Sequence, residues 1–543
     1  MIRKWPCFWF VSIAVFICFA PDLNNNLLNW DDAGYILDNS RIHTVSFETV
    51  RWAFSEFYLN YWAPLTWLSL AVDYAIWGTN PVGYHLVNNA LHALSAGTAM
   101  LICHTLFSAY RDVSAHDRPL KLSVETSLVC SVVTALFFAI HPLRVESVAW
   151  ATERKDVLSL FFGLPAVLFY LRHVQATGSH LPRVRTASLN YWLSLFFFTL
   201  SLLSKSLMIT VPVVLLVLDW FPLKRFKSAT VLAVILEKIP FFVLSGCAAL
   251  LTMKAQAKAI ASSAHIDLFT RTLNAFKSVM AYLKLTVWPF ELSPFYVHPV
   301  AIQSVTLAYA LPVALVMAIT LWCAVSLKRQ PIYMAVWLTY LITLFPFLGF
   351  TQVGAQAMAG RFTYFSGFPL AVLFGVGVMA MYCKVEGARP KVAVLGAAVA
   401  LILCVSAYVT VREISFWKDD VTLWTRVIAL SPNTGRAYFQ RGHAYWVMRD
   451  FSRALPDIDT ALVIAEQKKY DAMHDIYLLR ARVLFGMGEP ARAIDDYTRA
   501  LRTATGETRT IILYERGLAY EKLPPANPAH DDFEMSGTSG RTR

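Results

Sequence analysis

Apolar runs separated by short polar stretches fill the first 411 residues of the chain. Taking about 20 residues as the length of a membrane-spanning helix, runs of spanning or near-spanning length lie at residues 5–20, 83–107, 126–140, 157–171, 191–203, 207–218, 240–253, 305–325, 332–350, 366–382 and 392–409. The pattern predicts an all-α polytopic membrane domain over residues 1–411, with about eleven transmembrane helices. A long first loop, at about residues 21–80, interrupts the series.

A different periodicity begins after Arg412. Aromatic, small and large apolar residues recur at positions 438, 442, 445, 454, 458 and 461, and again at positions 477, 481, 484, 493, 497 and 500. This order of residues is typical of tetratricopeptide repeats, in which small residues let paired helices approach closely. The spacing predicts an all-α helical repeat solenoid over residues 412–523, with an ordinary amphipathic bundle as the alternative. The tail, residues 524–543, contains Pro, Gly and Ser and is predicted to be disordered.

Composition excludes several classes of protein. The chain is 57% hydrophobic and 15% charged, whereas soluble domains carry about 25% charged residues. A single soluble domain, a disordered protein and a secreted disulfide scaffold are therefore excluded. The net charge of +12 fits basic cytoplasmic loops better than a nucleic-acid partner, because no basic run is interleaved with aromatic residues. The eight cysteines form no CxxC pair and are predicted to be core residues.

Loop charge predicts the orientation. The N-terminus and the loops at residues 223–238, 328–329 and 384–391 are basic and fall on one side, which is predicted to be cytoplasmic. The first loop is acidic and external, and an odd number of spans places the repeats on its side. We expect a bacterial inner membrane with the repeats in the periplasm. An endoplasmic-reticulum membrane with lumenal repeats is the alternative.

Two adjacent carboxylates in the first loop, Asp31 and Asp32, are the first candidates for chemistry. Such neighbours repel each other, so one can stay ionised as a general base or metal ligand while the pKa of the other rises. The alternative is a helix cap or a loop that only stays outside the membrane. No motif for zinc, nucleotide or acyl-transfer chemistry is present, so a divalent metal at Asp31 and Asp32 is the one cofactor considered.

Charged residues beside apolar runs form further candidates, because such charges are costly unless paired or functional. They are Arg144, Glu146, Glu153, Arg154, Lys155, Lys205 and Arg361, with Tyr364 close to the last. Arg and Lys here are suited to holding a phosphate, and a structural ion-pair network is the alternative. Lys205 has no acid nearby in sequence, so it needs an anionic partner or must reach the membrane interface.

Four segments resemble the TMTC-like proteins. They are NWDDAGYILDN at 29–39, HPLRVESVAW at 141–150, ERKDVLS at 153–159 and QAMAGRFTY at 356–364. The family comprises membrane glycosyltransferases of the GT-C fold with tetratricopeptide repeats, related to protein O-mannosyltransferases. Two positions depart from its common pattern: Gly360 stands where an acidic residue is common, and Ser206 stands where proline is common after the lysine.

The resemblance implies a mechanism. A polyprenyl-phosphate sugar, expected to be mannose, would donate its sugar with inversion to Ser or Thr hydroxyls of proteins. Asp31 or Asp32 would be the base. Arg154, Lys155 and Arg361 would hold the donor phosphate, and the repeats would bind the acceptor protein. The supporting residues would be Arg144, Glu146, Glu153, Lys205 and Tyr364.

Two other functions stay open from the residues alone. A surface-polysaccharide polymerase or ligase would rely on Arg and His in late external loops, where this chain has fewer candidates than in its early cluster. A non-enzymatic membrane anchor that presents repeats to partners fits if the charged clusters are structural. A transporter fits less well, because the ionisable residues gather at one face of the membrane and not at mid-span.

Overall fold

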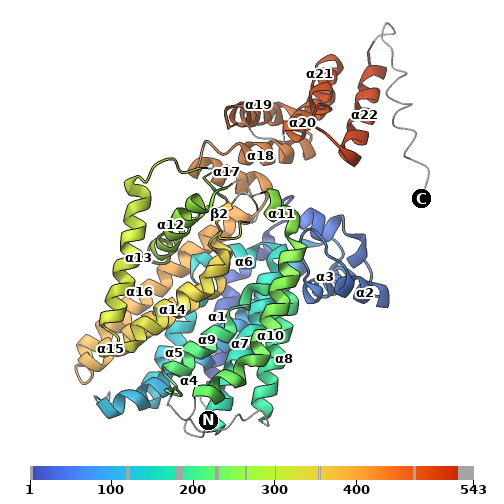
Figure 1. Ribbon diagram of the computed structural model, residues 1–543. Coiled ribbons are helices and arrows are strands. Elements are labelled where there is room, and N and C mark those ends of the chain that lie inside the picture. Colours follow the sequence, from blue (N-terminus) through green and yellow to red (C-terminus); the bar gives the residue numbers. More distant parts are fainter. Residues whose placement is uncertain are drawn as a thin grey trace. The chain divides into compact units, whose positions relative to one another are not determined.

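A computed structural model shows an all-α membrane protein (Figure 1). It describes residues 4–117, 123–177, 188–226, 231–262, 266–299, 301–352, 354, 356–468 and 473–523. The chain divides into two compact units, Met1–Lys418 and Asp419–Arg543. The domain limits expected at residues 411 and 523 remain predictions, and the predicted disordered tail at 524–543 lies outside the described residues.

The first unit is a bundle of apolar helices. Its long elements are α1 (Lys4–Phe19), α4 (Pro81–Asp117), α5 (Val124–Ala139), α7 (Arg154–Thr177), α8 (Leu189–Ser204), α9 (Val211–Trp220), α10 (Val231–Ala255), α13 (Leu307–Val325), α14 (Pro331–Leu344), α15 (Thr363–Val385) and α16 (Arg389–Ile414). Among the described residues seven helices are long and apolar enough to cross a bilayer, or eight if the bent pair at Val124–Ala139 and Pro142–Ala149 is one span. The chain is therefore an integral membrane protein.

Three further predicted spans are shorter apolar helices, at Leu189–Ser204, Ser206–Trp220 and Pro331–Phe347. Each has fewer residues than the ~20 that a helix normal to the membrane needs. The count of eleven spans therefore remains a prediction.

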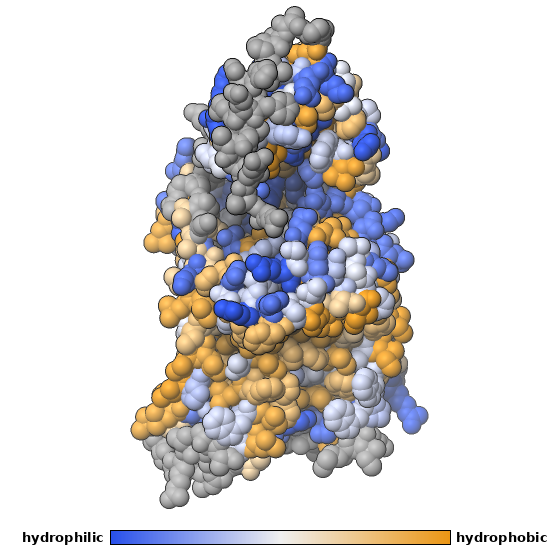
Figure 2. All heavy atoms as spheres, turned by 90° about the vertical axis from the view of Figure 1, so that its right-hand side faces the viewer, coloured by the Kyte–Doolittle hydropathy of each residue, from blue (hydrophilic) through white to orange (hydrophobic). Residues whose placement is uncertain are grey.

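Large apolar side chains are exposed on several helices of the first unit. Figure 2 shows hydrophobic residues gathered over the helices on the face in view. Leu250, Leu321 and Leu401 leave about two thirds of their surface uncovered. Large apolar side chains are exposed in this way where lipid replaces water as the solvent.

The first loop folds into short helices between α1 and α4. They are η1 (Ala20–Asn24), a π-helical turn η2 (Ala33–Leu37), η3 (Ser40–Ile42), α2 (Phe47–Ser55) and α3 (Pro64–Trp77). Ser46 caps α2 by accepting the N–H of Thr49 at 3.1 Å, a role for which Ser is well suited. Trp52, Trp67 and Tyr35 are buried together in a small aromatic core. The loop is thus an ordered subdomain at one end of the bundle. We call this end, with the later segments that complete it, the first-loop end.

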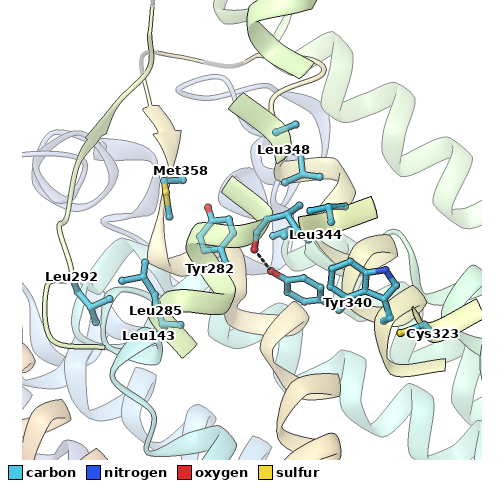
Figure 3. Packing of buried hydrophobic residues seen from close by; sticks show 13 residues of the cluster. Leu143, Tyr282, Leu285, Leu292, Cys323, Tyr340, Leu344, Leu348 and Met358 are labelled. Carbon is cyan, nitrogen blue, oxygen red and sulfur yellow. Dashed lines mark hydrogen bonds between the residues drawn. The ribbon is translucent and has the colours of Figure 1, made fainter. Parts of the chain in front are cut away.

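Later segments complete this end. They are η4 (Pro142–Arg144), α6 (Val145–Ala149), η5 (Ala151–Glu153), η6 (Ser206–Met208), α11 (Ala257–Ser262), α12 (Leu268–Val287), β1 (Tyr296–Val297), η7 (Phe345–Phe347), β2 (Gln356–Met358), η8 (Gly360–Phe362) and η9 (Ser415–Trp417). The two strands pair antiparallel, with Tyr296 opposite Met358. Figure 3 shows Met358 packed beside Tyr282 of α12, and Tyr340 of α14 bonded to the carbonyl of Val279 at 2.9 Å. The amphipathic α12 therefore anchors the strand that precedes η8.

A buried charge cluster lies at the opposite end of α7. Asp219 accepts bonds from Tyr170 at 2.6 Å and pairs with Lys238 at 2.8 Å, and Glu237 pairs with His173 at 2.7 Å and Arg225 at 2.8 Å. The 17 residues from Asp156 to His173 correspond to about 26 Å of helix. Charged clusters therefore tie the helices together near both ends of the bundle.

The second unit is built from antiparallel helix pairs. Its elements are α17 (Asp420–Leu430), α18 (Gly435–Val447), α19 (Phe451–Lys468), α20 (Met473–Gly486), α21 (Pro490–Ala500) and α22 (Gly506–Glu521). An ion pair recurs: Arg441 binds Asp457 through two bonds of 2.7 and 2.8 Å, and Arg480 binds Asp496 through two of 2.6 and 2.8 Å. Assignment of these pairs as tetratricopeptide repeats remains a prediction.

The repeated ion pair gives a test of this unit. Arg480 contacts two acids, the buried Asp496 and the half-exposed Asp459 at 3.0 Å. Asp496→Asn should destabilise α20 and α21 by about 1–3 kcal/mol, because it weakens a bidentate bond away from water. Asp459→Asn is the matched control and should cost less than about 1 kcal/mol. Hydrogen exchange of α20 and α21 in the full chain measures the stability loss caused by each variant. Equal losses for the two variants would contradict the larger contribution expected from the buried Arg480–Asp496 pair.

Candidate functional site

The carboxylate of Asp32 joins the first loop to the start of α7. It is fully buried, and its Oδ2 accepts the N–H of Leu28 at 2.8 Å while its Oδ1 accepts the N–H of Thr152 at 3.0 Å. Both oxygens are thus occupied by backbone donors, one from its own loop and one 120 residues away. Burial raises the pKa of Asp32 to about 7, and the backbone hydrogen bonds and Thr152 moderate that rise.

Asp31 has different surroundings. It is half-buried, and within the described residues its carboxylate makes no hydrogen bond or ion pair, while its backbone oxygen accepts the N–H of Tyr35. A base must keep lone pairs that a substrate proton can reach. Of the two predicted carboxylates, Asp31 meets this requirement, and Asp32 has the geometry of a positioning residue.

An aromatic stack connects Asp31 to the predicted cations. Trp30, its neighbour, stacks on Trp150 with 4.6 Å between ring centroids. On Trp150 also lie the guanidinium of Arg361, at 5.5 Å, and the ammonium of Lys155, at 5.8 Å. Both are within the reach of cation–π attraction. The structure therefore brings together residues 31, 155 and 361, which the sequence places in three separate segments.

Six charged side chains form a network beside this stack. Glu153 lies between three cations: Lys155 and Lys205, each at 3.2 Å, and Arg361 at 3.5 Å. Lys205 also pairs with Asp156 at 2.6 Å, and Arg361 pairs with Glu146. The anionic partner expected for Lys205 is thus within the chain. Three acids balance three cations, which lowers the cost of burying them.

The acids and two of the cations differ in exposure. Glu146, Glu153 and Asp156 are 1–6% exposed, whereas Lys205 and Arg361 are 11% and 13% exposed. Lys205 and Arg361 line a cavity of about 320 Å³, together with Asn60, Tyr61, Gln352 and Gln356. The network therefore presents positive charge and amide groups to the cavity and keeps its carboxylates behind them. Such a wall is suited to an anion.

Arg361 is held by its own segment. The strand β2 precedes Arg361, and the N–H of Ala359 donates to the Tyr282 hydroxyl at 3.0 Å. The guanidinium of Arg361 donates to the side-chain oxygen of Gln356 at 2.7 Å. A Cβ at position 360 would lie 2.8 Å from Oε2 of Glu146. Gly360, where the resembling family commonly has an acid, therefore leaves the space that the Glu146 carboxylate fills as partner of Arg361.

Arg154 lies apart from the cavity. It is fully buried and pairs with Asp73 at 2.7 Å, and it donates to the Asn88 side chain at 2.5 Å and to Ser69 at 2.8 Å. Its guanidinium is therefore engaged by helices α3 and α4. Arg154 is therefore not among the cations that line the cavity.

Arg144 and Tyr364 also lie inside the protein. Arg144 donates to the backbone and side chain of Thr363, and the Tyr364 hydroxyl bonds to His92 at 2.7 Å. Both contacts fix the start of α15, directly after Arg361. These two predicted supporting residues therefore have the contacts of positioning groups.

Sequence reasoning missed several residues of the site. Asn88 of α4 donates to the carbonyls of Val148, Trp150 and Ala151 at 3.1–3.3 Å and so holds the turn before α7. The sequence does carry a signal for Asp73, because an acid in the apolar segment of α3 needs a charged partner. Asn88, Tyr61 and Gln356 carry no comparable signal.

Some buried polar atoms around the stack have no partner among the described residues. They are the Tyr35 hydroxyl, Nε1 of Trp150 and Nε2 of Gln356. Buried donors are normally satisfied, and an unsatisfied one costs about 1–3 kcal/mol.

A divalent metal at Asp31 and Asp32 fits this arrangement poorly. Both oxygens of Asp32 already accept N–H groups. In the part of the chain that the structure describes, no group of three or more His, Cys, Asp or Glu side chains is placed to hold a metal ion.

Comparison with known proteins gives partial matches. The chain is 30% identical to protein O-mannosyl-transferase Tmtc3 of Drosophila melanogaster over 203 residues, which is 34% of this chain and 20% of that protein. It is 28% identical to human TMTC4 over 251 residues, or 43% of this chain and 32% of the relative. Human TMTC1 matches at 29% over 230 residues, or 39% and 24%.

The chain is similar to TMTC proteins over part of its length. It spans between a fifth and a third of the length of these three curated relatives. No family model matches it, and no solved structure matches it. The Drosophila relative and the two human relatives are named protein O-mannosyl-transferases, in agreement with the family that the four sequence segments resemble.

The pKa of Asp32 predicts how stability depends on pH. Because folding raises this pKa from 3.8 to about 7, the folded chain keeps a proton that the unfolded chain releases between these values. The contribution of Asp32 to stability is complete below about pH 4 and is lost as pH rises to 7, by about 4 kcal/mol in total. Asp32→Asn should remove this slope and cost about 1–3 kcal/mol at low pH, because one N–H loses its acceptor.

Thermal unfolding in nanodiscs from pH 5 to pH 8 measures that slope. The control is Asp38→Asn, which changes an exposed acid of the same loop and should leave the slope unchanged. If the stability of the Asp32→Asn chain depends on pH as steeply as that of the wild type, the raised pKa of Asp32 is not the cause of the slope.

The contact between Gly360 and Glu146 predicts that the glycine and the glutamate can be swapped between these two positions. Glu146→Gly should lower stability by up to about 3–5 kcal/mol, since Arg361 loses its main partner in a buried site. Gly360→Glu should also destabilise, because its side chain collides with the Glu146 carboxylate. The double variant moves the carboxylate across the contact and should recover most of the lost stability. Thermal midpoints in detergent test this, and a double variant no more stable than the sum of the single losses would refute it.

Proposed function

We propose that the chain is a membrane glycosyltransferase that moves mannose from a polyprenyl-phosphate donor to Ser or Thr hydroxyls of proteins. One observation carries the proposal. Asp31, with free lone pairs, lies one aromatic stack away from a cavity lined by Lys205 and Arg361. A transferase of this kind needs a base and an anion site for the leaving group.

The chemistry would take one step. Asp31 removes the proton of the acceptor hydroxyl as its oxygen attacks the anomeric carbon from the face opposite the phosphate. The bond from that carbon to the phosphate oxygen breaks, so the configuration inverts and the lipid phosphate leaves. Lys205 and Arg361 stabilise the charge on the phosphate, while the acids behind them keep both cations in place.

Lys155 has a supporting role in this proposal. Its ammonium is buried over the rings of Tyr35, at 4.8 Å, and Tyr61, at 5.3 Å. It also donates to the carbonyl of Thr152, whose N–H holds Asp32. Lys155 thereby connects the aromatic wall of the site to the segment that carries both aspartates.

The relatives' names support the protein acceptor and the sugar. The lipid-linked donor is supported by the position of the cation-lined cavity next to apolar helices. We place the first-loop end on the periplasmic side of a bacterial inner membrane, or on the lumenal side of the endoplasmic reticulum, because the opposite loops are basic. The helix pairs of the second unit would bind the acceptor.

Asp31→Asn tests the base. Removing a general base typically costs 10²–10⁴-fold in rate, so transfer of radiolabelled mannose from polyprenyl-phosphate mannose to a Ser/Thr-rich protein should fall by at least about 100-fold. The full chain is assayed in nanodiscs, with thermal unfolding as a check of folding. Asp38→Asn in the same loop is the matched control and should keep wild-type activity. Unchanged transfer by Asp31→Asn would refute the role of this residue.

A further inference from the structure

A groove of about 760 Å³ crosses the second unit, and each of the helices from α18 to α22 contributes residues to its lining. Four aromatic side chains line it, namely Trp446, Phe451, Phe485 and Tyr497. Gly486 leaves the Phe451 ring its place against α20, because a Cβ at this position would lie 2.5 Å from the ring. The groove therefore offers a partner several flat rings, as the centres of protein-binding surfaces commonly do.

Arg449 brings a positive charge to this groove from a left-handed backbone position. It lies two residues after α18 with a φ of +59°, just as Gly488 lies two residues after α20 with a φ of +82°. The N–H of Arg449 donates to the carbonyl of Trp446, and the N–H of Gly488 donates to the carbonyl of Phe485. The two turns are therefore equivalent, and glycine is the residue that such a turn favours. An arginine held there at a cost in backbone strain indicates a use for its side chain.

The charge of Arg449 is not compensated within the described residues. Its side chain is exposed and makes no hydrogen bond or ion pair with any of them. Arg482, the other arginine that lines the groove, is bound by the Glu515 carboxylate at 2.7–3.1 Å and lies over the Trp446 ring at 5.5 Å. The charged side chains of the lining thus leave one positive charge, which Arg449 carries.

These features together fit an extended peptide in which a carboxylate stands beside an aromatic side chain. The aromatic side chain packs among the rings, and the carboxylate accepts two hydrogen bonds from the guanidinium of Arg449. A basic segment is repelled by Arg449. A nucleic acid fits poorly, because one uncompensated cation is too few for a phosphate backbone and Glu515 adds a negative charge to the groove.

We propose that this groove binds an extended segment of the acceptor protein in which an aromatic residue stands next to Asp or Glu, with the carboxylate at Arg449. This rests on the proposed function, in which the second unit binds the acceptor. The groove then selects acceptor proteins by an acidic and aromatic docking sequence. That sequence is separate from the Ser or Thr whose hydroxyl receives the sugar.

Binding of synthetic peptides tests the proposal without turnover. The full chain in nanodiscs, with no sugar donor, is titrated with a short fluorescent peptide that has Asp-Asp-Phe-Glu at its centre. Replacing its acids by their amides, or its Phe by Ala, should each weaken binding at least about 10-fold, because a charged hydrogen bond or an aromatic anchor is lost. Binding should also weaken as salt is added. An amide peptide that binds as tightly as the acidic one would overturn the proposal.

Arg449→Gly removes the charge and restores the residue that the turn favours. It should weaken binding of the acidic peptide at least about 10-fold, and it should not lower the thermal midpoint of the chain, so that unfolding does not explain the loss. Arg502→Gly is the matched control, because it removes an exposed arginine that follows α21 and does not line the groove. Arg502→Gly should bind the peptide as the wild type does, and wild-type binding by Arg449→Gly would refute the proposal.

A second pair of variants tests the place of binding. Val447, at the end of α18, lines the groove, whereas Val463 of α19 does not, and both side chains are more than half exposed. Val447→Asp should weaken binding of the acidic peptide at least about 10-fold, because like charges meet in the groove. Val463→Asp should leave binding unchanged. Equal effects of the two variants would show that the peptide binds elsewhere.

The outcomes separate this proposal from the proposed function. Asp31→Asn should bind the acidic peptide as the wild type does, because the peptide needs no base. In the transfer assay, Arg449→Gly should raise the KM for a Ser/Thr-rich protein that carries the docking sequence at least about 10-fold. If the peptide binds through Arg449 but no mannose is transferred, the proposed function is wrong and the groove stands as a binding site. If mannose is transferred but Arg449→Gly changes neither peptide binding nor KM, the groove proposal is wrong.

Discussion

The arrangement of the first-loop end depends on its buried ion pairs, each of which joins two segments of the chain. Removing one partner of a buried pair costs several kcal/mol. The partners therefore fix which segments lie side by side. Asp73 of α3 holds Arg154 of α7, and Glu153 of η5 and Asp156 of α7 hold Lys205, which follows α8. Hydrophobic packing alone does not distinguish these helices, because lipid is as apolar as their side chains.

The same compensation gives the site its polarity. Carboxylates that bind the cations from inside leave the outer faces of Lys205 and Arg361 toward the cavity. Asp32 gives both of its oxygens to backbone N–H groups, whereas the Asp31 carboxylate makes no hydrogen bond or ion pair within the described residues. The contacts of neighbouring groups thus decide which charged side chains at this end are engaged inside the protein and which line the cavity.

Part of this arrangement was predictable. The alternation of apolar runs and polar loops indicated an all-α membrane protein, and the charged segments at 31–32, 153–155 and 361 were expected to meet. Other parts were not predictable. The partner of Lys205 is 49 residues away, and the role of Gly360 depends on Glu146, 214 residues earlier. The residues next to these positions in the sequence do not predict such long-range contacts.

The sequence by itself determined which segments lie in the membrane and which lie in water, because hydropathy and charge can be read locally along the chain. It thereby determined the helical class, the membrane location and the candidate charged residues. The tertiary structure alone decided which candidates face a cavity and which are engaged inside, as with Lys205 and Arg154. The physical reason is that the availability of a charge depends on its distance to partners, and those distances are set by how the helices pack.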